Sequence, residues 1–398
     1  MKQRPIVDLV YFDAGGGHRS AAMALEKVIQ ASDYPWDVRL VNLQEVLDPL
    51  DVFRKVTRVR LQDLYNLMLA KGWTLGSRQL LRPMQGVIRI YHRPAVKLLG
   101  QYWRNQRPDM VVSLVPNLNR ALFESIEEAL PGVPFVTILT DFADFPPHFW
   151  MEDQEQYFIC GTERAVQQAF DMRHHVSRVF RVSGMILRPE FYDPQHVERD
   201  RERVRLGLDP HTPTGLVLFG GAGANKMLSI ARRLGNSKLD VQLIMICGRN
   251  TKLRARLEKL KARSKIFVEG FTKDIAHYMR LSDFLIGKPG PGSISEALKM
   301  QLPVIIEKNA WTLPQEHYNA EWVREHGAGI VLKSFNDIEA GVADLLAEDR
   351  LSGMRAKISS LENRAVYEIP EILERVLLKH ASGRAASKEE GVSYGRNT

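Results

Sequence analysis

The stretch GKPGPGSISEALKMQLPVIIE, residues 287–307, decides the fold class. The apolar run DFLI ends just before it, the run PVIIE closes it, and SISEALKM between them has the pattern of a helix. A buried strand, a glycine-rich turn, a helix and a second buried strand make up a βαβ unit of a parallel sheet. The stretch therefore predicts an α/β fold whose chemistry lies at the turn.

The same alternation extends along the whole chain. Apolar, β-branched runs separated mostly by helical patterns occur at 6–12, 38–43, 110–116, 135–142, 157–161 and 179–184, and again at 215–221, 241–248, 266–271, 283–290, 303–309 and 329–332. Each half opens with a strand that ends in a glycine cluster, FDAGGGH in the first and FGGAGAN in the second. We therefore predict two Rossmann-like, doubly wound domains that face each other across a cleft.

The domain limits follow from composition. We expect residues 1–190 to form the first domain and residues 205–350 the second, since a charged, proline-rich linker lies near 185–212. Residues 352–380 have a helical pattern and are predicted to pack back on the first domain. Residues 381–398 lack an apolar pattern and are predicted to be disordered.

Composition places the chain among soluble globular proteins, with 398 residues of which 44% are hydrophobic and 26% charged. Cys160 and Cys247 stand in apolar runs, which predicts small buried residues in a reducing compartment rather than a disulfide or a metal site. The N-terminus runs into a glycine turn, unlike a signal peptide, and no run of 18 apolar residues predicts a transmembrane helix. We expect a cytoplasmic protein.

The net charge of +8 is unevenly placed. Residues 52–107 hold 12 Lys and Arg against one acid, Asp63, and interleave them with aromatic residues that include Trp73 and Trp103. One interpretation is a solvated basic face. The other is a surface for anionic lipid or another polyanion, with the aromatic residues at the membrane interface. The composition also suits RNA, but no nucleic-acid motif accompanies it, so none is expected as a partner.

The turn at 287–292 has the chemistry of a phosphate cradle. Its glycines allow close approach of the backbone to a ligand, and its prolines stiffen the turn. The first amides of the helix, expected to begin near Ser293, favour an anion, and Lys288 adds a positive charge. Gly221 and Gly223 in the turn FGGAGAN offer a second, weaker signal for the same diphosphate.

Polar residues after the turn have two interpretations. Glu296 has the chemistry to accept hydrogen bonds from a ribose diol. Alternatively, Ser293 and Glu296 form a capping box that only stabilises the helix start. Gln315, Glu316 and Asn319 follow the next strand and either bind sugar hydroxyls or cap a helix.

Residues 268–332 resemble the C-terminal domain of the monogalactosyldiacylglycerol synthases, which are GT-B glycosyltransferases of the family 28 type. The resemblance rests on the order GFTKD, KPGPGSISEAL, PQE with a following Asn, and GAG. It implies a UDP-sugar site with roles for the residues already named. Gly290, Pro291, Gly292 and Ser293 would meet the diphosphate, Glu296 the ribose, Phe271 and Thr272 the uracil, and Gln315 and Glu316 the sugar.

The first half supplies candidates for the base. His18 in GGGHRSAA stands at an expected helix start, where the positive end of the helix lowers the pKa of an imidazole and keeps it able to take a proton. The alternative is a capping or packing histidine. The motif resembles the N-terminal motif of the same family, which implies that His18, with Gly16 and Gly17, faces the acceptor.

The stretch TDFADFPPHFW, residues 140–150, also follows a strand. Asp141 is either a second candidate base or a group that orients His18. The stretch resembles a family segment linked to the acceptor and to lipid contact, which implies such roles for His148 and Trp150. The chain departs from that pattern by having Phe149 where the family has a proline. GMILRPEF, residues 184–191, resembles the family's crossover between domains.

The expected reaction is inverting transfer of a hexose, galactose or glucose, from a UDP-sugar to a lipid hydroxyl such as that of diacylglycerol. Because helix N-termini and Lys288 would stabilise the leaving UDP, and no D-x-D motif occurs, we expect no metal and no cofactor. The protein would act peripherally at the inner face of the membrane. Two alternatives remain, a UDP-sugar epimerase or hydrolase of the same fold, and a non-catalytic nucleotide-sugar binder.

Overall fold

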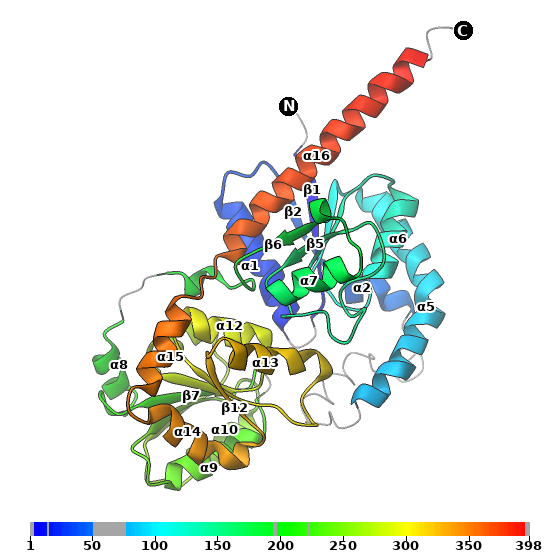
Figure 1. The fold of residues 1–398 in the computed structure, drawn as a ribbon. Helices are drawn as coiled ribbons and strands as arrows, with labels where there is room; N and C mark the ends of the chain where they lie inside the picture. Colours follow the sequence, from blue (N-terminus) through cyan, green and yellow to red (C-terminus); the bar gives the residue numbers. More distant parts are fainter. Residues whose placement is uncertain (1–3, 14–15, 51–76, 194–196, 222, 395–398) are drawn as a thin grey trace. The chain divides into compact units, whose positions relative to one another are not determined.

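A computed structural model describes residues 4–13, 16–50, 77–193, 197–221 and 223–394. The chain forms two compact units, drawn in Figure 1. The first is built from residues within Met1–Leu61, Gln79–Ile186 and Arg364–Thr398, and the second from Leu187–Asn363. Each unit contains one six-stranded sheet, so the prediction of two doubly wound α/β domains is confirmed.

The first sheet has the strand order β2-β1-β3-β4-β5-β6, and every pairing in it is parallel. Its strands are β1 (Ile6–Tyr11), β2 (Asp37–Asn42), β3 (Met110–Ser113), β4 (Phe135–Ile138), β5 (Tyr157–Cys160) and β6 (Val179–Arg181). The accompanying helices are α1 (Gly17–Ala31), α2 (Leu43–Leu47), α5 (Ser77–Gln106), α6 (Asn119–Ala129), α7 (Glu163–Asp171) and α16 (Ala365–Tyr394). The strand order changes direction between β1 and β3, which is where such sheets bind ligands.

The second sheet has the order β12-β11-β10-β7-β8-β9, again with parallel pairings throughout. Its strands are β7 (Thr214–Leu218), β8 (Gln242–Ile246), β9 (Ile266–Glu269), β10 (Phe284–Gly287), β11 (Val304–Glu307) and β12 (Gly329–Leu332). Its helices are α8 (Arg199–Arg205), α9 (Lys226–Asn236), α10 (Thr251–Glu258), α11 (Ile275–Arg280), α12 (Pro291–Lys299), α13 (His317–Glu325), α14 (Ile338–Leu346) and α15 (Arg350–Ser359). Here the order reverses between β7 and β10.

The buried strands explain why the sequence reads as continuous apolar runs. All residues of β7, β8, β10 and β11 are buried, whereas the edge strands β9 and β12 are only partly covered. Helices on both faces exclude water from the inner strands, so no alternation of polar residues is needed. Cys160 and Cys247 are free and buried, as predicted.

The unit boundaries differ from those expected. The charged segment after Leu187 contains α8, which belongs to the second unit because Arg203 donates to the carbonyl of Leu281 at 2.9 Å and to Asp283 at 2.7 Å. Residues 352–380 form two helices instead of one. Of these, α15 stays with the second unit through a 3.0 Å bond from Arg355 to Asp283.

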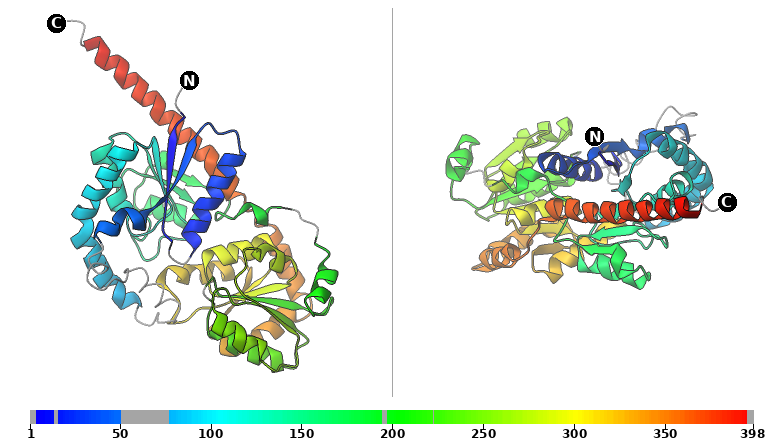
Figure 2. Two further views of the ribbon diagram at one scale, coloured as in Figure 1. Left: turned by 180° about the vertical axis from the view of Figure 1, so that it is seen from behind. Right: turned by 90° about the horizontal axis from the view of Figure 1, so that it is seen from above.

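The last helix, α16, belongs to the first unit. Near its start, the carboxylate of Glu368 accepts the backbone N–H of Ser183 at 2.7 Å, and further along its length the helix contacts α1. Figure 2 shows α16 as one long rod. The predicted disorder of residues 381–398 is wrong for 381–394, which continue this helix through several good helix formers, and residues 395–398 lie outside the described part of the chain.

Within the described residues, no helix is both long and apolar enough to cross a bilayer.

Candidate active site

The turn after β10 is the start of α12. Gly290 is the N-cap and Pro291 the first helical residue, so the helix begins two residues earlier than expected. Proline fits this position because its missing N–H would have no partner there. The Ser293 hydroxyl donates to the carbonyl of Gly290 at 3.2 Å. The following amides open the helix at the carboxyl end of β10, which is the geometry of an anion site.

Two side chains hold this turn in place. The ammonium of Lys288 donates to the Glu316 carboxylate at 2.8 Å, which ties the turn after β10 to the start of α13. Asn319 donates its amide to the carbonyl of Pro289 at 2.8 Å. Because Asn319 is fully buried, its visible role is to fasten the turn rather than to reach a sugar hydroxyl. Its Oδ1 atom is buried without a hydrogen-bond partner within the described residues.

The structure contradicts the capping-box interpretation of Glu296. With Gly290 as N-cap, Glu296 lies in the second turn of α12, too far along to bond the N-cap amide, and α12 has no side-chain cap. The side chain is partly exposed. Desolvation by the surrounding protein raises the pKa of Glu296 to about 7, and the positive charge of Arg188 opposes this rise. A carboxyl held this way is available to a ligand.

The second glycine turn follows β7, the neighbour of β10 across the reversal point of the sheet. Gly223 has a φ of +61°, and a Cβ there would lie 2.6 Å from the carbonyl of Cys247, so packing alone requires glycine. A Cβ on Gly221 would meet nothing within 4 Å, as would one on Gly292. Open space thus lies beside one glycine of each turn.

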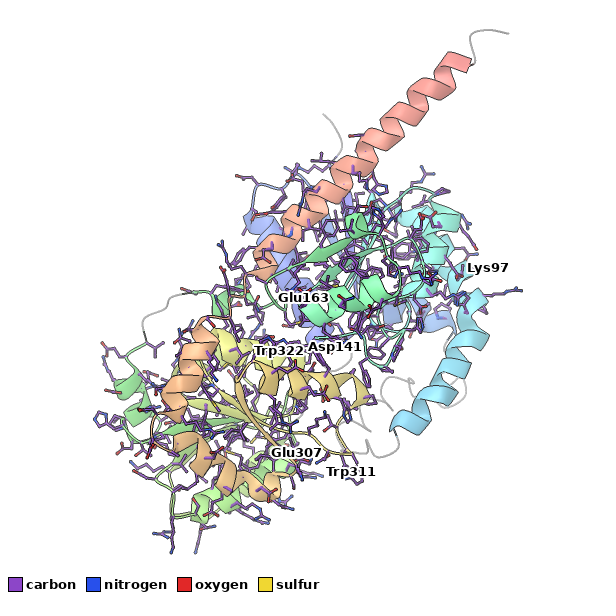
Figure 3. The ribbon with its side chains drawn as sticks, viewed as in Figure 1. Lys97, Asp141, Glu163, Glu307, Trp311 and Trp322 are labelled. Atoms are coloured by element: carbon purple, nitrogen blue, oxygen red, sulfur yellow. The ribbon has the colours of Figure 1, made fainter. Side chains whose placement is uncertain are left out.

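Lys226, the first residue of α9, makes a further contact between two strand ends of this sheet. Lys226 donates to the carboxylate of Glu307 at 2.7 Å, and Glu307 also accepts hydrogen bonds from the Asn309 side chain and the Phe335 backbone. Glu307 is buried at the carboxyl end of β11, and Figure 3 labels it together with Trp311 in the segment that follows. The turns after β7 and β11 are therefore linked by an ion pair.

The residues predicted to lie near the uracil, Phe271 and Thr272, follow β9. The ring of Phe271 is 51% exposed, and the guanidinium of Arg249 lies over it at 4.7 Å from the ring centre. Thr272 accepts the backbone N–H of Asp274 at 3.0 Å and so shapes the turn into α11. Gln315 is partly exposed beside Glu316. Arg249 was missed because a single arginine after a strand carries no signal by itself.

In the first unit, His18 is the second residue of α1, the first helix after β1, with Gly16 as N-cap and Gly17 as the first helical residue. Its Nδ1 lies 3.1 Å from the hydroxyl of Thr140, which follows β4, and the ring also bonds the backbone of Leu114 after β3. Burial lowers the pKa of His18 to about 4, against the opposing effect of the Leu114 bond. The imidazole is neutral at physiological pH, as expected, although burial rather than the helix end is the cause.

Asp141 contacts a different partner from the one expected. Its Oδ2 accepts the indole N–H of Trp150 at 2.9 Å, and the Trp150 ring centre lies 5.8 Å from that of His18. Figure 3 labels Asp141 in the first unit. The side chain that bonds His18 is Thr140, which sequence reasoning missed. Trp150 is completely buried, so the expected contact of this ring with lipid is wrong.

The loop 144–150 is organised by Asp144, another residue that was missed. Its carboxylate accepts the backbone N–H groups of His148 at 3.0 Å and Trp150 at 2.6 Å. His148 is exposed and has a φ of +65°. The N–H of Phe149 donates to the carbonyl of Pro146 at 3.1 Å. A proline at 149 would lose this bond and disfavour the left-handed backbone of His148, so the departure from the family pattern has a local reason.

The predicted membrane-facing tryptophans are not supported. Trp103 is completely buried in the first unit and donates its indole N–H to Ser125 at 2.8 Å, because α5 packs this ring into the core. Its assignment to a membrane contact is wrong. Trp73 lies outside the described residues.

Comparisons with known proteins follow the same division of the chain. Residues 216–376 match the family described as the glycosyltransferase family 28 C-terminal domain. A probable monogalactosyldiacylglycerol synthase 3 of Oryza sativa is 29% identical over 90% of this chain and 72% of its own length. A processive diacylglycerol beta-glucosyltransferase of Bacillus licheniformis is 25% identical over 94% of this chain and 96% of its own length. Residues 216–376 are therefore similar to a family 28 C-terminal domain, and the chain is a glycosyltransferase.

Solved structures share the fold of this glycosyltransferase. The MurG of Acinetobacter baumannii superimposes with a TM-score of 0.60 at 14% identity, over 93% of this chain and 100% of its own. A UDP-GlcNAc 2-epimerase of Neisseria meningitidis bound to UDP-GlcNAc gives a TM-score of 0.58 at 12% identity, over 93% of this chain and 100% of its own. The two-sheet architecture is therefore GT-B. Because an epimerase shares it, the fold alone does not distinguish transfer from epimerisation.

Proposed function

We propose that this glycosyltransferase moves a hexose, galactose or glucose, from a UDP-sugar to the hydroxyl of diacylglycerol or a similar lipid, with inversion at the anomeric carbon. The observation that carries the proposal is the extent of the two relatives named for diacylglycerol. Each aligns with 90% or more of this chain, so the likeness includes the first unit as well as the donor half.

The donor half supplies the parts that a UDP-sugar needs. The opening amides of α12 and the space beside Gly221 and Gly292 suit a diphosphate. Glu296, raised in pKa and not engaged in a cap, suits the ribose diol. The exposed face of Phe271 suits the uracil ring, and Gln315 and Glu316 suit the sugar.

The first unit supplies the base. The neutral imidazole of His18 lies at the reversal point of the sheet, between the ends of β1, β3 and β4. In the proposed reaction it takes the proton of the acceptor hydroxyl as that oxygen attacks the anomeric carbon. UDP leaves with its charge stabilised by helix amides and by Lys288, without a metal or cofactor. Asp141 supports this site through Trp150 and remains the alternative base.

The acceptor is a lipid, so we propose that the enzyme docks peripherally on the inner face of an anionic membrane. The basic segment 52–107 remains the sequence-based candidate for that contact. Most of its aromatic residues lie outside the described part of the chain or, like Trp103, in the core.

The test is to incubate the purified protein with each UDP-hexose and a total lipid extract, and to identify products by mass spectrometry. A hexosyl diacylglycerol with the anomeric configuration opposite to that of the donor supports the proposal. A second incubation without lipid addresses the alternatives. Turnover of UDP-hexose to an epimer or to free sugar favours the epimerase or hydrolase, and tight binding of intact donor without any product favours a non-catalytic binder.

A further inference from the structure

A second basic segment lies in the second unit. Residues 226–265 contain 12 Lys and Arg and two acids, Asp240 and Glu258. The net charge of +10 in this segment is close to the +11 of residues 52–107, so the basic residues are not confined to that first segment. All 12 cationic side chains are exposed. Within the described residues, ion pairs engage only two of them, Lys226 with Glu307 and Arg254 with Glu258.

The fold gathers these cations on one face of the second unit. The consecutive crossovers β7-α9-β8 and β8-α10-β9 run in the same direction across the sheet, and right-handed crossovers then place both helices on the same face. The helices contact each other, as Figure 1 shows, and α10 contacts β9. We call the exposed cations of α9, α10 and the loops that follow these two helices the α10 face. They are Arg232, Arg233, Lys238, Lys252, Arg254, Arg256, Lys259, Lys261, Arg263 and Lys265.

The donor site does not account for this face. Lys259, Lys261, Arg263 and Lys265 come after the end of α10 and before β9 begins at Ile266. They therefore lie at the amino end of the strand, whereas the donor turns lie at the carboxyl ends. Like charges spaced along one helix face destabilise it, as Lys252 and Arg256 do at i and i+4. A single-sign surface of this density indicates a polyanionic partner.

We propose that the α10 face docks on an anionic lipid bilayer, as a second contact besides residues 52–107. The choice of a membrane rests on the proposed function, in which the acceptor is a lipid. It also rests on composition, because residues 226–265 contain no Phe, Tyr or Trp, and single-stranded nucleic acids need aromatic side chains for stacking.

An exposed apolar side chain near the cations fits the same partner. A hollow of about 290 Å³ borders the α10 face at the amino end of β9. Its lining comes from the end of α8, from α10 and the loop after it, and from β9, and the surface that it exposes is more polar than apolar, with Glu258 and Ser264 beside Leu260 and Phe267. On α8, Val204 is 58% exposed. Cations next to accessible apolar side chains are the combination that binds the interfacial layer of a bilayer.

The test uses the full chain with vesicles of phosphatidylcholine alone or mixed equally with phosphatidylglycerol. The variant Lys259→Glu/Lys261→Glu/Arg263→Glu reverses three exposed cations on the α10 face. The matched control, Arg324→Glu/Lys333→Glu/Lys357→Glu, makes the same charge change around β12, the opposite edge of the sheet. We expect the first variant to lower partitioning onto phosphatidylglycerol vesicles at least about tenfold and to weaken its salt dependence. The control should change partitioning less than about threefold.

Equal losses in the two variants would reduce the effect to net charge and overturn the proposal, as would unchanged partitioning of the first variant. Loss of RNA binding with vesicle binding intact would assign the face to nucleic acid instead. Transfer to detergent-dispersed diacylglycerol is measured in parallel and should be equal in both variants and the parent. If no lipid is glycosylated even by the parent, the proposed function fails, whereas the vesicle result still decides whether the face binds a bilayer.

Discussion

The ammonium of Lys288 lies 2.8 Å from Oε1 of Glu316, so the cation expected at the diphosphate and a carboxylate expected at the sugar form one ion pair. Glu316 is nearly buried, whereas Lys288 is about half exposed. The pair holds the two groups in a fixed position relative to each other. It also means that Lys288 does not act as an isolated positive charge.

The first prediction tests this coupling. Lys288→Met should weaken binding of both UDP and UDP-hexose at least about tenfold, because it removes a cation and leaves a buried carboxylate uncompensated. Glu316→Gln should weaken UDP-hexose binding while leaving UDP affinity within about threefold, because its expected contact is with the sugar. In calorimetric titrations the double variant should lose less binding free energy than the two single variants lose together. Additive losses would show that the two residues bind the donor independently.

The second prediction concerns Glu296, whose pKa is raised to about 7. Only the ionised carboxyl accepts hydrogen bonds from both ribose hydroxyls, so affinity for UDP-hexose should rise between about pH 6 and pH 8. Glu296→Gln should lower affinity and remove this pH dependence. UDP-hexose is the right probe because its diphosphate is a diester with no proton to lose in this range.

The raised pKa of Glu296 also predicts how the stability of the ligand-free protein depends on pH. The folded pKa of Glu296 lies above the value of 4.5 expected when unfolded, so the unfolded state binds fewer protons between these two values. Stability from this group is present below pH 4.5 and lost as pH rises through about 7. The thermal unfolding temperature of the parent should therefore fall relative to that of Glu296→Gln as pH rises from 4.5 to about 7. Parallel curves would mean that the carboxyl is ionised throughout.

Sequence alone was sufficient for the features that depend on local pattern. The alternation of buried strands with helices predicted both sheets, and the glycine clusters located the turns after β1, β7 and β10. The helix start was misplaced at Ser293 because Ser-x-x-Glu is a strong local cap signal, whereas Pro291 takes the first helical position. Proline at the first helical position is also a local signal, so two good local signals competed and the sequence alone did not rank them.

The partners of the site residues were the part that sequence could not give. Thr140 bonds His18 across 122 positions, and Lys226 bonds Glu307 across 81, because the sheet order brings their strand ends together. Trp103 was assigned to the membrane from its basic neighbours, yet the packing of α5 on the sheet buries it. Composition predicts that a segment is basic and aromatic but not which side of its helix faces the core.

The third prediction tests His18 as the base. His18→Ala should lower kcat about 10²- to 10⁴-fold with little change in the KM for UDP-hexose, since the imidazole serves the acceptor. Thr140→Val keeps the shape of its side chain but removes the hydroxyl that holds the ring, and should lower kcat by about tenfold. In the parent, the acidic limb of the kcat profile should fall near pH 4, following the lowered pKa. A limb near pH 6.5 would mean a solvated histidine, and full activity of His18→Ala would leave Asp141 as the base.

The fourth prediction concerns the stability of the donor-binding unit. Asp283 accepts hydrogen bonds from Arg199, Arg203 and Arg355 on α8 and α15. Burial raises the pKa of Asp283, but the arginines and the Thr214 amide outweigh burial and hold it below 3.8. Asp283→Asn should therefore destabilise the protein by about 3–5 kcal/mol, because it leaves the buried guanidinium of Arg203 without its counter-charge.

The control for Asp283 is an ion pair of similar length at the surface. Asp344 and Arg350 lie 2.8 Å apart with both side chains about half exposed, and Asp344→Asn should change stability by less than about 1 kcal/mol. Denaturant unfolding of both variants measures the difference. Because the folded pKa of Asp283 is depressed, its contribution is present above pH 3.8 and lost as pH falls through the folded pKa, so the gap between parent and Asp283→Asn should close only in strong acid. Equal effects of the two substitutions would mean that the arginines around Asp283 remain solvated and that α8 and α15 are held by other contacts.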